Sequence, residues 1–447
     1  MFDGATDVSI CKNEIVYARF VDNGVPKVLY VKIQDVEHAH AAGVLEAIEK
    51  SLDGIQEEWT WKEKLIATAS DGANVNIGRK NSVVALLKND VPHLLSMHGV
   101  CHRLELGTLD TMKARDAKIF ADLKSVLLNL HKHYHYSPKA LREVKALSEA
   151  MEQNMIKPVN LQGTRWMPHL SGCLDVLLRQ YQVFVAHFEN TVQGKIGTID
   201  VQSRAKLILK HLKKYDLLSH MHFLKDMLAV LSELSLQFQK DACCLPDASE
   251  ALETTCLQLV ALQQRPGKSL HTFLDEVIHE NNEYMLKGIR LSPPTLTAEQ
   301  LKQKQNTLVD SVLNHINKRM GDMDTNHLLK DMQIFYPINL PATDAELAVY
   351  GEDQLEALCE FYSDVLNRLD YDVEHLKQTE WPALKIKMKR EPNNTSIQDF
   401  YHRLFTNSNQ KETLKNILVL VETVLCIPVS SAIWERGYSA MARIKSD

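Results

Sequence analysis

The sequence predicts two parts: an α/β part with a mixed sheet flanked by helices, and an all-α part that interrupts it. Three observations lead to this fold class. Short β-forming segments alternate with helical patterns over about the first 100 residues. Apolar residues then recur at helical spacing over most of the remaining chain, and the last residues form one more amphipathic helix. At 447 residues, the chain is long enough for more than one domain.

The first part is expected to follow the order βββαβαβ. Residues 14–33 predict a hairpin, because two runs of β-forming residues flank the turn signal Asn23-Gly24. A helix follows, since three aliphatic residues recur at helical spacing: Val44, Ile48 and Leu52. The later elements of this part are a strand at Leu65–Ala69, a helix around Val83–Leu87 and a strand at Leu94–Met97.

After about residue 105 the patterns are helical, and no further strand is expected. Two stripes of large apolar residues, at 174–188 and 224–238, each predict a helical face. Helical patterns continue to about residue 335, a loop is expected at Pro337–Pro341, and more helices follow. The final segment, 430–447, carries an apolar face and predicts an amphipathic helix.

The composition excludes several classes of protein. Hydrophobic residues make up 45% and charged residues 24%, as in globular proteins, and no apolar run is long enough to span a membrane. Without a basic and apolar leader, secretion is not expected. The eight cysteines form no C-x-x-C pair, which favours reduced thiols and argues against a zinc site. The net charge of −6 means that any DNA contact has to come from a local patch.

Three acidic residues stand at positions that suit a catalytic site. Asp3 lies in F-D-G-A-T-D, Asp71 follows a predicted strand in A-S-D-G-A-N, and Glu435 lies in the last predicted helix. Each also has an ordinary interpretation, because Asp-Gly after a strand is typical of a turn and a helical glutamate is commonly solvated. The three residues are informative only as a set.

Together with two further motifs, this set resembles the hAT superfamily of DNA transposases. The further motifs are H-G-V-C-H-R-L-E-L, which contains His102, and Thr164-Arg165-Trp166. The terminal S-S-A-I-W-E-R-G-Y-S resembles the S-x-x-S-E-R-x-F-S element of the family. The motifs follow the family order over nearly the whole chain. Within this superfamily, the chain resembles vertebrate transposon-derived zinc-finger proteins with a hAT dimerisation region, although no finger motif is found in these residues.

The resemblance implies an RNase-H-like mixed sheet interrupted by a large helical insertion. The core would comprise residues 1–113 and 412–447, the latter with a truncated dimerisation element, and the insertion would be 114–411. The resemblance also implies a DDE triad that binds Mg²⁺ or Mn²⁺ for two-metal chemistry on DNA, made of Asp3, Asp71 and Glu435.

The resemblance further implies DNA contacts from His102, Arg165 and Trp166. Trp166 would stack on an unpaired base beside the cleaved end, which is worth about 1–3 kcal/mol per base. His102 would assist at the scissile phosphate. From the residues alone, a core tryptophan at a helix start is the favoured interpretation of Trp166. His102 is equally well interpreted as a hydrogen-bonded histidine at a helix N-terminus.

The chain departs from the family pattern in several places. Three residues differ from those usual in the family: Ala5, Gly99 and Trp434. Because only two residues precede Asp3, we expect the first strand to fray and to hold Asp3 poorly. Asp447 falls inside the dimerisation element, so self-association is expected to be partial.

Two basic segments remain. They are a helical face at Lys206–Lys214 and the run Lys385–Arg390. We interpret both as solvated faces, with phosphate contact and nuclear import as the alternatives.

Three hypotheses for the function follow. The first is a domesticated or decayed nuclear protein derived from a hAT transposase, which associates with itself and has DNA as a second candidate partner. The second is an active metal-dependent DNA transposase or nuclease, favoured by the intact acidic trio. The third is a helical scaffold that binds only proteins. We expect no membrane or small-molecule partner, Mg²⁺ or Mn²⁺ only if the chain is active, no zinc, and no useful DNA cleavage.

Overall fold

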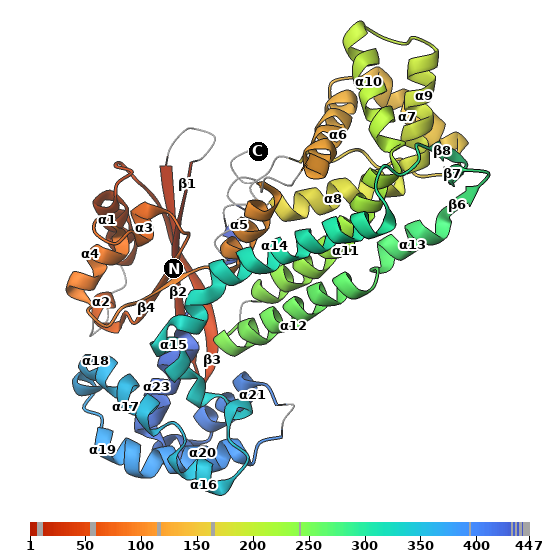
Figure 1. Ribbon diagram of the computed structural model, residues 1–447. Helices are drawn as coiled ribbons and strands as arrows, with labels where there is room; N and C mark the ends of the chain where they lie inside the picture. The colour runs from red at the N-terminus through yellow and green to blue at the C-terminus, as the bar shows by residue number, and fades with distance from the viewer. Residues whose placement is uncertain are drawn as a thin grey trace. The chain divides into compact units, whose positions relative to one another are not determined.

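The computed structural model describes residues 1–6, 12–53, 60–113, 118–161, 166–240, 243–392 and 395–430, with Ala432, Ile433, Arg436, Gly437 and Ala440. The chain divides into two compact units, and Figure 1 labels their helices and strands where there is room. Unit 1 comprises Met1–Arg103, Leu236–Ala251 and Arg319–Asp447, and unit 2 comprises Leu104–Ser235 and Leu252–Lys318. These bounds differ from the expected ones, because residues 319–411 belong to the unit that holds the sheet.

The strands predicted for the first part are present in unit 1. An antiparallel sheet contains β1 (Phe2–Thr6), β2 (Lys12–Asp22) and β3 (Val25–Asp35), and a parallel pair contains β4 (Ala67–Ser70) and β5 (Leu95–His98). β1 lies beside β4, but the two sheets are separate hydrogen-bonded ladders. The single mixed sheet that we expected is therefore divided between β1 and β4.

The tip of the β2–β3 hairpin is the expected two-residue turn. Asn23 and Gly24 have φ values of 48° and 77°, the left-handed conformation that such turns require. The tip packs on α21 (Ile397–Thr406), where His402 Nδ1 donates to the Asn23 carbonyl at 2.9 Å. A Cβ on Gly24 would lie 2.8 Å from the backbone carbon of Tyr401 and 2.8 Å from the Phe405 ring, so there is no room for a side chain.

Helices cover the sheet through one apolar core. Phe2 and Val16 pack with Val44 and Ile48 of α1 and with Leu87 of α4, all buried. The N-terminal helices of unit 1 are α1 (Ala41–Leu52), α2 (Trp61–Lys64), α3 (Asn74–Ile77) and α4 (Val83–Asp90). The helices predicted around residues 44–52 and 83–87 are thus confirmed.

The C-terminal portion of unit 1 is helical. Its α-helices are α15 (His327–Asp331), α16 (Asp344–Val349), α17 (Glu352–Phe361), α18 (Ser363–Arg368), α19 (Val373–His375), α20 (Trp381–Lys389), α21 (Ile397–Thr406), α22 (Ser408–Thr413) and α23 (Lys415–Cys426). Its 3₁₀ turns are Met332–Phe335 and Pro337–Asn339, and Leu376–Glu380 is a π-helical turn. The loop expected at Pro337–Pro341 therefore begins with a 3₁₀ turn.

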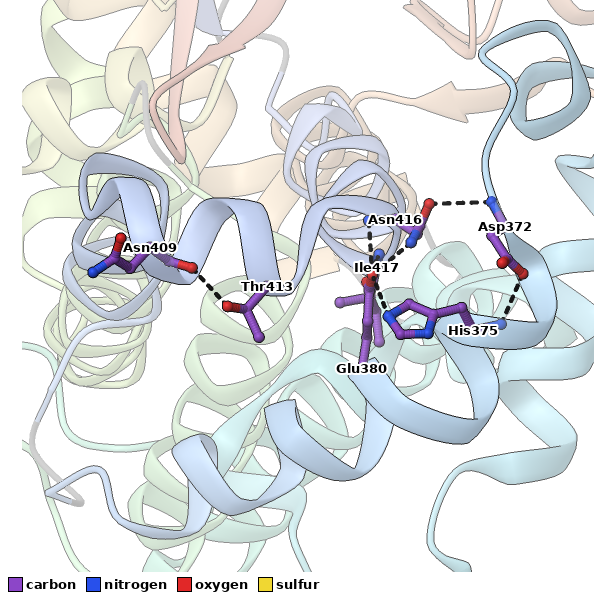
Figure 2. A network of polar contacts seen from close by, with 7 residues as sticks. All are labelled: Asp372, His375, Glu380, Asn409, Thr413, Asn416 and Ile417. Atoms are coloured by element: carbon purple, nitrogen blue, oxygen red, sulfur yellow. Dashed lines mark hydrogen bonds and ion pairs between the residues drawn. The ribbon is translucent and has the colours of Figure 1, made fainter.

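A buried carboxylate caps α23 from a distant part of the chain. Glu380 is 1% exposed and accepts hydrogen bonds from the Ile417 N–H at 2.7 Å, the Asn416 side-chain amide at 2.5 Å and the Asn416 N–H at 3.4 Å (Figure 2). His375 Nε2 lies 3.8 Å from the same carboxylate, and Asn416 Oδ1 accepts from the Asp372 N–H at 3.1 Å. Because the first amides of a helix lack internal partners and carry partial positive charge, the carboxylate stabilises the start of α23.

Unit 2 is built mainly of long helices. They are α5 (Val100–Lys113), α6 (Lys118–His135), α7 (Pro138–Ala150), α8 (Trp166–Arg179), α9 (Tyr181–Gln193), α10 (Ile199–Leu212), α11 (Tyr215–Phe238), α12 (Leu245–Gln264), α13 (Lys268–Glu276) and α14 (Ala298–Thr325), and α5, α11, α12 and α14 contribute residues to both units. The stripe at 174–188 spans two helices that are separated at Gln180.

No helix among the described residues is both long and apolar enough to cross a membrane.

The expectation that strands stop after residue 105 is wrong. Unit 2 contains an antiparallel sheet of β6 (Val277–Glu280), β7 (Glu283–Leu286) and β8 (Ile289–Leu291). The two connections are Asn281-Asn282 and Lys287-Gly288, and all four residues have positive φ. These are two-residue hairpin turns, which hold together strands too short to show a clear alternating pattern.

Candidate cation and DNA site in unit 1

Asp3 stands on a paired strand. Met1 and Tyr17 exchange two backbone hydrogen bonds of 2.9 Å, and the pairing continues from Phe2↔Val16 to Thr6↔Lys12. The expectation that this strand frays is therefore wrong. Residues on both sides of Asp3 pair with β2, so Asp3 lies inside the ladder and not at its end. The Asp3 carboxylate accepts from the Gly4 N–H at 3.0 Å.

Asp71 lies directly after β4, as predicted. Its Oδ1 accepts from the Ala73 N–H at 3.1 Å and from the Asn76 side-chain amide at 2.7 Å. These bonds form a local turn that leads into α3 and orient the carboxylate. Because β1 lies beside β4, the fold brings Asp3 and Asp71 to neighbouring strands.

A buried glutamate, Glu14, connects the two aspartates electrostatically. Glu14 is 1% exposed, and its Oε1 has no hydrogen-bond partner among the residues that the structure describes. Its register partner is Gly4, where an added Cβ would lie 2.9 Å from Glu14 Oε2. Burial, together with the smaller effects of the Asp3 and Asp71 charges, raises the pKa of Glu14 to about 8, and the charges of Lys12 and the N-terminal amine act in the opposite direction. Both aspartates thus lie within electrostatic reach of one side chain.

Glu435, the third predicted acid, lies outside the described residues. Nearby Gly437 is described, and a Cβ added there would lie 2.6 Å from Ile15 Cδ1 and would also overlap the Tyr17 hydroxyl. Ile15 is the register partner of Asp3, so their side chains point to the same face of the sheet. Gly437 therefore packs on the face that carries Asp3.

Two histidines lie where β5 ends and α5 begins. The rings of His98, which ends β5, and His102 are 5.5 Å apart. The His98 ring rests on Gly72, where an added Cβ would lie 2.5 Å from it, and thus sits next to Asp71. Burial, followed by the positive charge of Arg103, lowers the pKa of His98 to about 4, so this ring is neutral at pH 7. His102 is half-buried in the first turn of α5.

Sequence reasoning singled out neither Glu14 nor His98. His98 is the first residue of the H-G-V-C-H-R-L-E-L motif, so a signal for it was present. Glu14 has no local signal, because its place beside Gly4 depends on the register of β1 against β2.

Trp166 belongs to unit 2 and begins α8. It is half-buried and makes an edge-on contact with Phe120, with ring centroids 5.7 Å apart. The next residue, Met167, donates its N–H to the Glu105 carboxylate at 3.0 Å, which fixes the helix start. Arg165 lies outside the described residues. The role of Trp166 in base stacking stays a prediction.

The two basic segments are partly neutralised within the protein. In unit 2, Lys213 pairs with Glu189 at 2.5 Å and Lys214 with Asp122 at 3.3 Å. In unit 1, Lys385 is 3% exposed and donates to the Ala348 carbonyl at 2.8 Å, so the run 385–390 is a helix with one buried lysine.

The donor chemistry of this site fits a hard divalent cation. Asp3 and Asp71 supply carboxylate oxygens, the ligands that Mg²⁺ and Mn²⁺ prefer. Within the described ranges, no three histidine, cysteine, aspartate or glutamate side chains are gathered closely enough to bind a metal, and Glu435 is not part of those ranges.

No known protein-family model matches the chain.

Proposed function

We propose that the protein derives from a hAT transposase and that the end of the sheet in unit 1 is an RNase-H-like site for divalent-cation chemistry on DNA. The observation that carries the proposal is that Asp3 lies on β1 and Asp71 directly follows the neighbouring strand β4, both within electrostatic reach of Glu14. The strand arrangement supports it as well: β1 lies between antiparallel β2 and the β4–β5 parallel pair.

Each residue of the site would have a distinct role. Asp3 and Asp71, with Glu435, would hold the cations, which when bound activate the attacking oxygen and stabilise the leaving oxygen. The β1–β2 ladder fixes the backbone of Asp3, and the Ala73 and Asn76 donors fix the Asp71 carboxylate. His102 would hydrogen-bond to a DNA phosphate beside the cations.

A second candidate is the decayed form, which associates with itself without cutting DNA. It is favoured by the net charge of −6 and by the internal pairing of Lys213 and Lys214. Both features reduce the counterion release that drives DNA binding. Under either candidate function, the protein would act in the nucleus.

Nicking of supercoiled plasmid separates these candidates. With the first strand intact, we expect Mn²⁺-dependent nicking by the purified chain, reduced on the order of 10²-fold or more in Asp71→Ala and in Glu435→Ala. Asp53→Ala, an exposed aspartate at the end of α1, is the matched control and should retain full activity. If the folded wild-type chain does not nick DNA, the decayed form becomes the favoured candidate. If Asp71→Ala still nicks DNA, the proposed cation site is wrong.

A further inference from the structure

Three histidines alternate with other residues at the end of α6, in unit 2. They are His131, His133 and His135 of the segment H-K-H-Y-H. His133 is 3% exposed and lies against the Phe188 ring, whereas His131 is half-buried and His135 is exposed. Because residues four positions apart share a face of a helix, the outer two histidines form a surface pair and the middle one belongs to the core.

The imidazoles of His131 and His135 are close enough to bind one metal ion together. Their ring centroids are 4.8 Å apart, and the angle between their planes is 24°. Two imidazole nitrogens on one zinc ion lie within about 4 Å of each other, since each Zn–N bond is about 2.0–2.1 Å long. Rotation of the two side chains alone is enough to reach that arrangement.

The spacing of this pair is that of a known zinc-binding pattern. Two histidines four positions apart on one helix face supply two zinc ligands in the motif H-E-x-x-H, whose glutamate is the general base. Lys132 stands in place of that glutamate. The pair therefore has the ligand spacing of the motif without its catalytic base.

No other polar group of the described chain occupies the two imidazoles. Among the residues that the structure describes, His131 and His135 form no hydrogen bond and no ion pair. The stacked pair of His38 and His40 differs in this respect, because His40 Nδ1 accepts from the Gly43 N–H at 3.2 Å. A metal ion at the α6 pair would therefore displace only water.

The charges near the pair act in opposite directions. The helix ends at His135, and the carbonyl groups of a last helical turn carry partial negative charge, which favours a bound cation. Burial, followed by the positive charges of His135 and Lys157, lowers the pKa of His131. A neutral imidazole is the form that binds a metal, but Lys157 also repels the metal itself.

We propose that His131 and His135 chelate a borderline transition-metal cation, Zn²⁺ or Cu²⁺, at the end of α6. Imidazole suits these ions, whereas Mg²⁺ prefers carboxylate and water oxygens. Within the described ranges no third histidine, cysteine, aspartate or glutamate completes a metal site, so water fills the other positions. The ion links the last two turns of α6, next to the turn into α7. The cysteine spacing argues only against thiolate ligands and does not bear on this pair.

Metal titration of the full chain tests the proposal. Zn²⁺ is added in the presence of excess Mg²⁺, which occupies oxygen sites, and calorimetry measures the affinity. His131→Asn and His135→Asn are each expected to weaken Zn²⁺ binding on the order of 100-fold, because the second imidazole of a chelate binds at high effective concentration. His271→Asn, at an exposed histidine on α13, is the matched control and should leave the affinity unchanged.

A spectroscopic readout and a variant with the opposite effect complete the test. Electron paramagnetic resonance of bound Cu²⁺ should show two coordinating nitrogens in the wild type and one in each histidine variant. Lys157→Ala should tighten Zn²⁺ binding by about twofold or more, because an exposed repelling charge is removed. Unchanged affinity in both histidine variants, or a single nitrogen on Cu²⁺ in the wild type, would overturn the proposal. DNA nicking is not needed for any of these readouts, so this site and the one in unit 1 are tested separately.

Discussion

Replacing Glu380 with alanine is expected to lower the free energy of unfolding by about 3 kcal/mol, a large share of the stability of a typical protein. The carboxylate is buried and accepts from both the side chain and the backbone of Asn416 and from the Ile417 N–H. Alanine leaves these donors buried without an acceptor and removes the negative charge from the start of α23. Urea denaturation followed by circular dichroism measures the loss.

The matched control is Glu374→Ala, six residues before Glu380. Glu374 is exposed and its carboxylate accepts from the exposed Gln378 side chain, so the expected change is within about 0.5 kcal/mol. Glu380→Gln, which keeps one acceptor oxygen, should lie between the two. If Glu380→Ala and Glu374→Ala lose the same free energy, the capping role of Glu380 is wrong.

Mild acid is expected to destabilise unit 2 strongly. His133 of α6 and His220 of α11 are 3% and 7% exposed, and burial lowers the pKa of each to about 4. Within the described part of the chain, neither ring nitrogen of His133 has a hydrogen-bond partner, and the ring centroid lies 5.0 Å from that of Phe188. An unfolded histidine titrates near 6.5, so between pH 6.5 and pH 4 the unfolded state binds more protons than the folded state.

The sign of the effect follows from this difference in proton binding. The free energy of unfolding falls as the pH falls through this window, by about 1.4 kcal/mol per pH unit for each of the two histidines. In His133→Phe, whose ring suits the aromatic surroundings, the slope of stability against pH should be smaller by about that amount. His271→Phe, at an exposed position on α13, tests whether loss of any histidine has this effect. Denaturant titrations at several pH values measure the slopes, and an unchanged slope in His133→Phe would refute the assignment.

Local sequence patterns predicted the N-terminal elements well. The Asn23-Gly24 turn, the helix around Val44 and the short strands before Asp71 and His98 each depend on neighbouring residues, and each is present. The β6–β8 sheet was missed because its strands are short and largely exposed, so no apolar alternation marks them. The grouping of 319–411 with the sheet is a matter of tertiary packing, which helical periodicity does not encode.

The candidate site was predictable only in part, and for a similar reason. Asp3 and Asp71 were found through motif order; Asp3 lies on β1, and Asp71 directly follows the neighbouring strand β4. Glu14 depends on strand register, and the Glu380 cap joins residues 36 or more positions apart, so neither has a local signal. The short first strand suggested fraying, because the sequence does not show that Met1 and Tyr17 exchange two hydrogen bonds.

The hairpin tip has a consequence for labelling the protein. Exposed two-residue turns are ordinarily good places to insert a tag or a fluorophore. Here Gly24 is both left-handed and in contact with the backbone of α21, and Asn23 is bound by His402. An insertion at this turn would separate β2 and β3 from the helix on which they rest. Asn281-Asn282, at the exposed β6–β7 turn of unit 2, is the better attachment point.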